Sequence, residues 1–196
     1  PVGTLAGAKS RLGETLDAEE RQDLVDRLLA RTVTAALAVD GLDDVLVVSP
    51  DREVLARAAD LGARTLRQRS RGLNAGLREA REDVVAGGAT ALLVLPIDLP
   101  FVSAAAIRRL TDAVHALPHP AVVLVPDRHG TGTNALTLSP PGAIDFAFGR
   151  GSRAAHRAAA EAVGATYREM DGPLTFDLDT PDDYVTVEAA TREGVG

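Results

Sequence analysis

Apolar residues recur along this chain at two spacings, and the spacing changes repeatedly from one end to the other. Between residues 17 and 37, leucine, valine and alanine return every three or four positions, which predicts a helix with one apolar face. Asp17 and Glu20 form a capping-box pattern at its start, and Gly41 lies just past its end. The short continuous run VLVVS at 45–49 instead predicts a buried strand of a parallel sheet.

Strand-like and helix-like segments alternate over most of the chain. The expected strands lie at 45–49, 64–66, 91–98, 121–127, 133–139, 165–170 and 176–179. The expected helices after the first lie at 51–61, within 72–88, after Ser103, at 152–163 and after Thr180. This order predicts an α/β fold with one doubly wound, mostly parallel sheet. The run at 133–139 follows a short Gly-rich turn, so we expect it to break the parallel order. No repeat or linker interrupts the pattern, and residues 1–196 are expected to form a single domain.

The composition narrows the classes of partner. Hydrophobic residues make up 45% and charged residues 25%, as in globular proteins. The formal net charge of −7 argues against a nucleic-acid partner. No apolar run approaches the roughly 20 residues of a bilayer span, and no signal-peptide pattern opens the chain, so we expect no membrane partner. The absence of cysteine excludes disulfides and thiolate metal sites and fits a reducing cytoplasm, where we expect the protein.

A carboxylate, Asp98, follows closely after an apolar run that predicts a buried strand. The run at 92–95 leads to Asp98, which stands between Pro96 and Pro100. In open α/β sheets, ligands bind beyond the carboxyl ends of the strands, so an acid at this point suits metal binding. The alternative is that Asp98 caps the next helix, but Ser103 is better placed to do so.

A second acidic site lies in the stretch FDLDTPDD. Alternate residues of an extended segment point to the same face, so Asp177 and Asp179 project together while their apolar neighbours turn the other way. Adjacent carboxylates repel unless a cation or proton separates them, and hard oxygen ligands suit Mg²⁺. Asp182 and Asp183 follow Thr180 in the first turn of the expected last helix, and we assign them a structural role.

The stretch GTLAGAKSRLG at 3–13 is one residue away from a P-loop, because Ala8 stands where the second glycine belongs. The expected helix also begins too late for a P-loop. Lys9 and Arg11 could still meet phosphates from this Gly-rich loop, and a solvated basic loop is the alternative. Lys9 is the only lysine among 21 basic residues, which favours a role for its compact ammonium group.

Two further Gly-rich stretches are candidate anion sites. DRHGTGTNAL at 127–136 and FGRGS at 148–152 contain small residues that let backbone amides approach an anion closely. Ser152 also stands where a helix should begin, which favours phosphate binding. Taken singly, each stretch could be only a turn. We interpret His156, one turn into that helix, as a packing or hydrogen-bonding residue rather than a catalyst.

Six motifs occur in an order and spacing that resemble a known family. They are LAGAKSRL, GLNAGL, DLP, GTGTNAL, FGRGS followed by His156, and DLDTPDD. Over nearly the whole chain they are similar to metal-dependent nucleotidyltransferases of the GT-A-like α/β type. The nearer resemblance is to the guanylyltransferases of coenzyme F420 biosynthesis, which act on 2-phospho-L-lactate or phosphoenolpyruvate.

The resemblance implies roles for particular residues. Ligands of two Mg²⁺ ions would be Asp98, Asp177 and Asp179. The phosphate of the acceptor would meet Thr133, Gly149 and Ser152. The GTP nucleotide would meet Leu5, Lys9, Arg11, Gly72 and Asn74. One departure is Gly3, because relatives often carry a lysine at that position.

The implied reaction needs no catalytic histidine or serine. An anionic phosphate oxygen of the acceptor attacks the α-phosphorus of GTP in line, and pyrophosphate leaves. A nucleotidyltransferase for a molybdopterin or a sugar phosphate is the nearest alternative, and a GTPase or ATPase is a more distant one. The sequence does not choose among 2-phospho-L-lactate, phosphoenolpyruvate and 3-phosphoglycerate, and it leaves open whether the chain is a homodimer.

Overall fold

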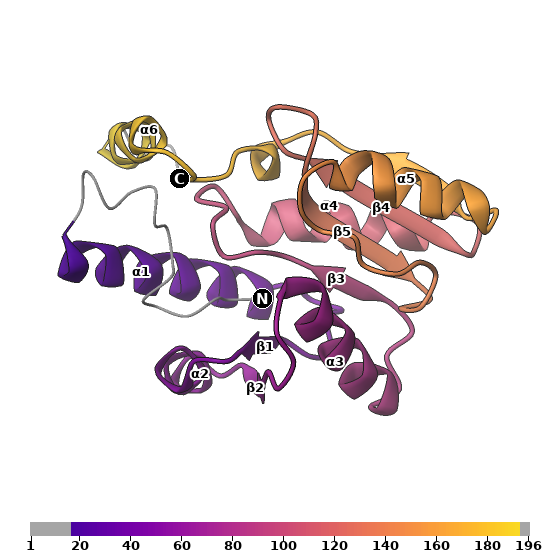
Figure 1. Ribbon diagram of the computed structural model, residues 1–196, viewed down its shortest axis with the longest axis horizontal. Coiled ribbons are helices and arrows are strands. Elements are labelled where there is room, and N and C mark those ends of the chain that lie inside the picture. Colours follow the sequence, from indigo (N-terminus) through magenta and orange to yellow (C-terminus); the bar gives the residue numbers. More distant parts are fainter. Residues whose placement is uncertain (1–16, 193–196) are drawn as a thin grey trace.

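The computed structural model describes residues 17–192 (Figure 1). Its helices are α1 (Ala18–Leu37), α2 (Arg52–Asp60), α3 (Leu73–Ala86), α4 (Ala104–His115), α5 (Ser152–Ala162), the short 3-10 helix η3 (Pro173–Thr175) and α6 (Pro181–Arg192). Its strands are β1 (Leu46–Ser49), β2 (Arg64–Arg67), β3 (Leu92–Val94), β4 (Ala121–Pro126), β5 (Thr133–Ser139) and β6 (Thr166–Glu169). The α/β class is confirmed.

The predicted doubly wound α/β architecture is confirmed, and among residues 17–192 the strands pair in two groups. β1 and β2 pair in parallel, and the other strands form a four-stranded sheet in the order β3-β5-β4-β6. In the larger sheet β5 runs antiparallel to both of its neighbours while β4 and β6 are parallel. The predicted break of parallel order at 133–139 is therefore confirmed. A cavity of about 650 Å³ lies between the two sheets, lined among others by Val47 of β1 and Leu93 of β3.

Helices cover both faces of the four-stranded sheet (Figure 1). On one face, α4 packs through Ile107 and Leu110 against the side chains of β4, together with the end of α1. On the other face, Ala160 of α5 and Leu77 of α3 join the core formed by β3, β4 and β5. All six residues of β4 are buried, which explains why its sequence is a continuous apolar run.

Local signals place the helix ends as predicted. The Asp17 side chain accepts from the Glu20 N–H at 2.9 Å, and the Glu20 carboxylate accepts from the Asp17 N–H at 2.8 Å, which completes the capping box. Ser103 caps α4 by accepting from the Ala106 N–H at 3.2 Å. Asp98 is thereby left to the loop, as expected.

Two expected strands are shorter or absent. β3 ends at Val94, because Pro96 and Pro100 in the next six residues have no N–H to give to a strand ladder. Residues 176–179 form no strand and continue from the 3-10 helix η3. The chain leaves β3 early and reaches the acidic segments through irregular backbone.

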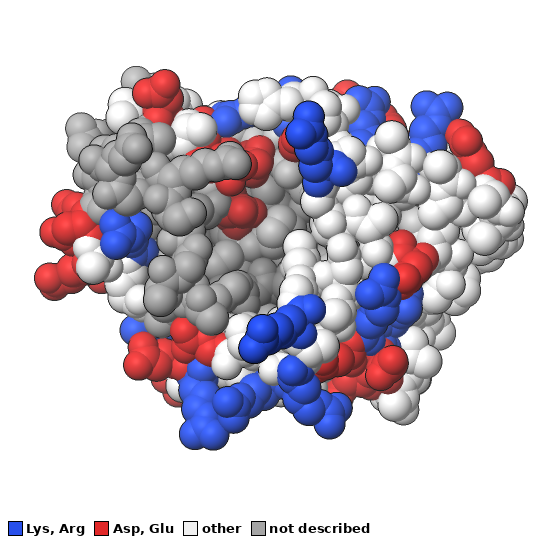
Figure 2. Space-filling model, viewed as in Figure 1, with Lys and Arg blue, Asp and Glu red and all other residues white. Residues whose placement is uncertain are grey.

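Charged side chains of both signs are interspersed on the face shown in Figure 2. The described part of that face has no continuous basic surface of the kind that binds nucleic acid. Among residues 17–192, no helix has the length and hydropathy to cross a bilayer.

Candidate functional site

Several of the predicted site residues that the structure describes lie at one edge of the four-stranded sheet. β4 ends at Pro126, and Thr133 pairs with it at the start of the antiparallel strand β5. β3 pairs through Val94 with Leu136 of β5, and the loop that bears Asp98 follows at this same edge. Because β3 and β4 run in the same direction, this is the carboxyl edge, where open α/β folds bind ligands.

The two acidic segments meet at this edge. The Leu178 N–H donates to the Asp98 carbonyl at 2.9 Å, so the two loops are joined by backbone. Leu178 is fully buried and packs in a small core that also contains Phe176 and Phe101. The apolar residues of the segment thus turn inward together. The prediction that Asp177 and Asp179 share the opposite face agrees with this packing.

Negative charge is concentrated here. Burial, together with the charges of Asp179 and Asp98, raises the pKa of the Asp177 carboxyl. A cation would relieve this repulsion, and carboxylate oxygens are the donors that Mg²⁺ prefers. In the described chain, no three such side chains already surround one point as a complete cage. Mg²⁺ is commonly held by one or two carboxylates plus substrate phosphates, so this donor set fits an incomplete site. We call Asp98, Asp177 and Asp179 the acidic side.

Asn134 of β5 holds the acidic side from upstream, which sequence reasoning missed. Its side-chain amide donates to the carbonyls of Leu174 and Thr175 at 3.1 and 3.0 Å and lies 3.5 Å from Asp177 Oδ1. Asn134 is buried, and its bond to the Leu174 carbonyl is shielded from water. The one sequence signal was an amide inside a predicted buried strand, where a polar side chain needs partners.

Arg128 and Asp183 hold the acidic side from downstream. The Arg128 guanidinium forms a two-bond ion pair with Asp183, and its second nitrogen lies 2.8 Å from Oδ2. The same Oδ2 accepts from the N–H groups of Asp179 and Thr180 at 3.0 and 2.8 Å. Burial alone would raise the pKa of Asp183, but these donors outweigh it and lower that pKa. The structural role predicted for Asp183 is confirmed, and Arg128 was missed.

The predicted acceptor residues lie together beside β5. Thr133 and Ser152 are both buried, and Gly149 has a φ of +130°, a conformation that favours glycine. The Ser152 N–H, expected to be available to a phosphate, already donates to the Gly149 carbonyl at 3.1 Å. That part of the prediction is wrong for this structure, because the first turn of α5 is closed by its own loop. The hydroxyls of Thr133 and Ser152 remain as candidate donors.

His156 links Thr133 to the loop that leads to Gly149 and Ser152. Its ring is fully buried, with Nδ1 3.1 Å from Thr133 Oγ1 and Nε2 2.9 Å from the Ala147 N–H. Burial lowers the pKa of His156 to about 4, so the ring is neutral at neutral pH. Its prediction as a packing and hydrogen-bonding residue is confirmed. We call Thr133, Gly149, Ser152 and His156 the neutral side.

Asn74 has a different surrounding from the one expected of a nucleotide contact. Its amide oxygen accepts from the Phe148 N–H at 2.9 Å, and its amide nitrogen donates to the Phe148 carbonyl at 3.0 Å. Both ends of the side chain are therefore engaged in holding the 148–152 loop against α3. Gly72, at the N-cap of α3, has a φ of +91° and open space beside its Cα. Its prediction as a nucleotide contact stays a prediction.

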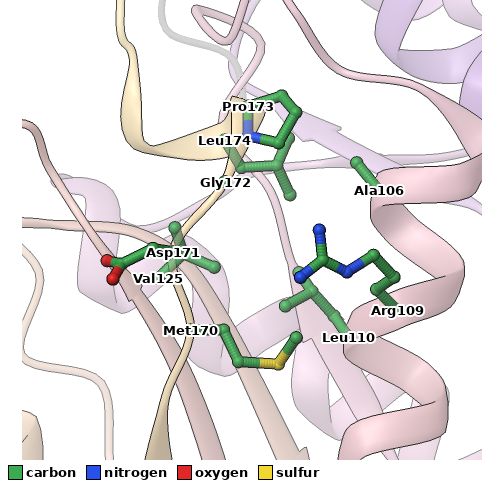
Figure 3. A pocket seen from close by; sticks show the side chains of 9 residues that line it. All are labelled: Ala106, Arg109, Leu110, Val125, Met170, Asp171, Gly172, Pro173 and Leu174. Atoms are coloured by element: carbon green, nitrogen blue, oxygen red, sulfur yellow. The ribbon is translucent and has the colours of Figure 1, made fainter.

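The remaining predicted nucleotide contacts, Leu5, Lys9 and Arg11, lie outside the described residues. A small pocket of about 10 Å³ lies between α4 and the segment after β6, where Arg109 points toward Gly172 and Pro173 (Figure 3). That volume holds roughly one water molecule, so the pocket is no substrate site.

Comparison of the sequence with known proteins gives a family match and similar relatives. The family model described as "Guanylyl transferase CofC like" matches residues 1–189. A phosphoenolpyruvate guanylyltransferase of Sphaerobacter thermophilus is 47% identical over 184 residues, which cover 93% of this chain and 87% of that protein. A protein of the same name from Rubrobacter xylanophilus is 47% identical over 191 residues, 97% of this chain and 92% of that one.

Solved structures support the fold. A putative nucleotide-diphospho-sugar transferase from Desulfovibrio desulfuricans superposes with a TM-score of 0.76 at 13% identity, covering 98% of this chain and 92% of that one. A CMP:2-keto-3-deoxy-manno-octonic acid synthetase complexed with CTP gives a TM-score of 0.62 at 12% identity, covering 85% and 88%. At these identities the likeness shows the shared α/β architecture alone.

Proposed function

Because this chain belongs to the CofC-like guanylyl transferase family, we propose that it transfers GMP from GTP to phosphoenolpyruvate with release of pyrophosphate. The observation that carries the proposal is the meeting of Asp98 with Asp177 and Asp179 at the carboxyl edge of the sheet, beside the buried hydroxyl of Thr133. An acidic side suits a metal–triphosphate, and a neutral side with hydroxyl donors suits a second phosphate.

The transfer exchanges one phosphorus–oxygen bond for another. A phosphate oxygen of phosphoenolpyruvate attacks the α-phosphorus of GTP, the bond from that phosphorus to the bridging oxygen breaks, and pyrophosphate carries away the electron pair. The attacking oxygen is already an anion, so no general base is required. The burial of His156, and its engagement of both ring nitrogens, agree with a reaction that has no catalytic histidine.

In this reaction the charged and the uncharged site residues would have different roles. Asp98, Asp177 and Asp179 would hold Mg²⁺, which supplies positive charge to offset the triphosphate and the leaving pyrophosphate. Thr133 and Ser152 would orient the acceptor phosphate through their hydroxyls, with Gly149 letting the loop approach closely. Lys9 and Arg11 would meet the triphosphate, and Gly72 the nucleoside. Asn74 would act through Phe148 rather than on the base.

The acceptor and pathway are the finer part of the proposal. Phosphoenolpyruvate is favoured over 2-phospho-L-lactate because both 47%-identical relatives carry its name. The resemblance of the motifs to enzymes of coenzyme F420 biosynthesis leads us to include that pathway, in the cytoplasm.

The test is an acceptor screen with purified protein, GTP and Mg²⁺. Phosphoenolpyruvate, 2-phospho-L-lactate, 3-phosphoglycerate and a sugar phosphate are supplied separately, with pyrophosphate release and product mass as readouts. We expect pyrophosphate and a guanylylated product with phosphoenolpyruvate. Orthophosphate from GTP without any acceptor would instead indicate a GTPase, and turnover of the sugar phosphate alone would indicate the other nucleotidyltransferase class.

A further inference from the structure

We propose that His156 is a positioning residue for the acceptor phosphate, because it orients the Thr133 hydroxyl and fixes the base of the 147–152 loop with one neutral ring. The inference rests on the proposed function, in that Thr133 and Ser152 are taken to contact the acceptor. The evidence for the positioning itself is the geometry around the ring.

The hydrogen bonds define which ring nitrogen carries the proton. The Ala147 N–H points at Nε2 from 2.9 Å, and a backbone N–H can only donate. Nε2 must therefore accept, which leaves the proton of the neutral ring on Nδ1. That nitrogen lies 3.1 Å from Thr133 Oγ1 and donates to it. The tautomer of His156 thus follows from the Ala147 N–H, because a backbone N–H can donate a hydrogen bond but cannot accept one.

This donation sets the direction of the threonine proton. A hydroxyl has one hydrogen to donate and two lone pairs that accept. Because the His156 N–H occupies a lone pair of Thr133 Oγ1, the hydroxyl hydrogen is directed away from the ring. An oxygen that accepts inside the core and donates outside it is suited to an anion at the sheet edge. A ring with the proton on Nε2 would reverse the bond and turn the hydrogen inward.

The same ring also fixes the loop that leads to Gly149 and Ser152. Ala147 is held by Nε2, and the next residue, Phe148, packs edge-on against the ring with centroids 5.0 Å apart. Asn74 of α3 holds both backbone groups of Phe148. The loop is therefore clamped from α5 and from α3 at two consecutive residues. Through its two ring nitrogens, His156 thus contacts both Thr133 and the base of this loop.

Two substitutions separate the two bonds. The amide of asparagine reaches about as far as Nδ1, so His156→Asn retains a donor for Thr133 and loses the acceptor for Ala147. The amide of glutamine reaches about as far as Nε2, so His156→Gln retains an acceptor for Ala147 and loses the donor for Thr133. Loss of one neutral hydrogen bond should lower kcat/KM for phosphoenolpyruvate roughly 2- to 12-fold. We expect the KM for GTP to stay within about twofold, and the exposed His115→Gln to be a neutral control.

A double-variant cycle decides between positioning and general damage to the core. In a Thr133→Val background the hydroxyl is gone, so His156→Gln should have little further effect on kcat/KM for phosphoenolpyruvate. His156→Asn, which acts through Ala147, should retain its effect there. Equal and additive losses from both substitutions, for acceptor and GTP alike, would overturn the proposal.

An independent measurement does not require activity. ¹⁵N NMR of the histidine ring should show a neutral His156 with its proton on Nδ1 at pH 7, and a proton on Nε2 would overturn the proposal. If the wild type shows no turnover with phosphoenolpyruvate, the proposed function has failed, and the same cycle is run with whichever acceptor turns over. Turnover by the wild type combined with an additive cycle means that the positioning role alone has failed.

Discussion

Thr133 and Asn134 are neighbours in β5, yet they support opposite sides of the site. Successive side chains of a strand point to opposite faces, so Thr133 faces His156 of α5 while Asn134 faces η3 and the residues just after it. The acidic side is built around carboxylates and held by an ion pair and backbone amides. The neutral side is built around hydroxyls and held by a neutral ring and an amide.

The difference teaches how an acidic protein can bring two anions together. Carboxylates near the acceptor would repel its phosphate, and the side-chain hydrogen bond to the Thr133 hydroxyl comes from the uncharged ring of His156. Carboxylates on the other side concentrate charge that a divalent cation can offset. The start of β5 thus lies between the acidic side, which would bind a cation, and the neutral side, which would bind the acceptor phosphate directly.

The largest effect should come from removing charge from the acidic side. Asp98→Asn and Asp179→Asn keep the shape of the side chain but remove the charge offered to a cation, and each should lower turnover roughly 1000-fold. Turnover is measured across a Mg²⁺ titration, since weakened binding should be partly recovered at high Mg²⁺. Asp182→Asn is the matched control, because Asp182 is an exposed acid in the same stretch. Wild-type turnover of Asp98→Asn at limiting Mg²⁺ would remove Asp98 from the metal site.

The Arg128–Asp183 ion pair, which holds the acidic side, should contribute to the free energy of unfolding. Arg128→Gln leaves the Asp183 carboxylate buried without its guanidinium, which should lower the free energy of unfolding by about 3–5 kcal/mol in urea. Arg108→Gln is the control, because Arg108 pairs at 3.1 Å with an Asp40 whose side chain is 94% exposed, and it should cost at most about 1 kcal/mol. Similar losses for the two variants would mean that the Arg128 pair is no stronger than a surface pair.

Local patterns predicted most of the fold but few of the supports of the site. Apolar spacing placed the helices, Asp17 and Ser103 capped them as expected, and the Gly-rich turn before 133–139 predicted the reversed strand. These features depend on residues a few positions apart. The irregular 176–179 segment depends on packing across the molecule, which spacing does not encode.

The supports escaped prediction for the same reason. Asn74 meets Phe148 across 74 positions and Arg128 meets Asp183 across 55, so only the folded chain shows these partners. The acids and hydroxyls were easier to find, because a charge at a strand end is unusual and a serine at a helix start marks an N-terminus that suits a phosphate. Asn134 is an intermediate case. The sequence showed that an amide in a buried strand needs hydrogen-bond partners, but it did not show which residues supply them.

The neutral side should respond to acid through His156. Its pKa in the folded protein is about 4 against the ordinary 6.5, so between these values the unfolded chain binds a proton that the folded protein excludes. Stability should therefore fall as the pH falls from 6.5 to 4, by about 3 kcal/mol from this group. Urea unfolding of wild type and His156→Gln at matched pH isolates the contribution, because all other groups are common to both. Parallel curves over this window would mean that the ring is not excluded from protonation.

The smallest of these effects should be that of the Ser152 hydroxyl, and it tests which substrate the neutral side receives. The Ser152 N–H is already bound to the Gly149 carbonyl, so Ser152→Ala removes the one donor that the side chain offers and leaves the loop closed. A hydrogen bond to a charged group is worth about 1.5–3 kcal/mol, or roughly 10- to 150-fold in kcat/KM for the acceptor. GTP affinity, measured by calorimetry without acceptor, should barely change. If Ser152→Ala weakens GTP binding and spares the acceptor, the neutral side belongs to the nucleotide and the two anions approach from opposite directions to those proposed.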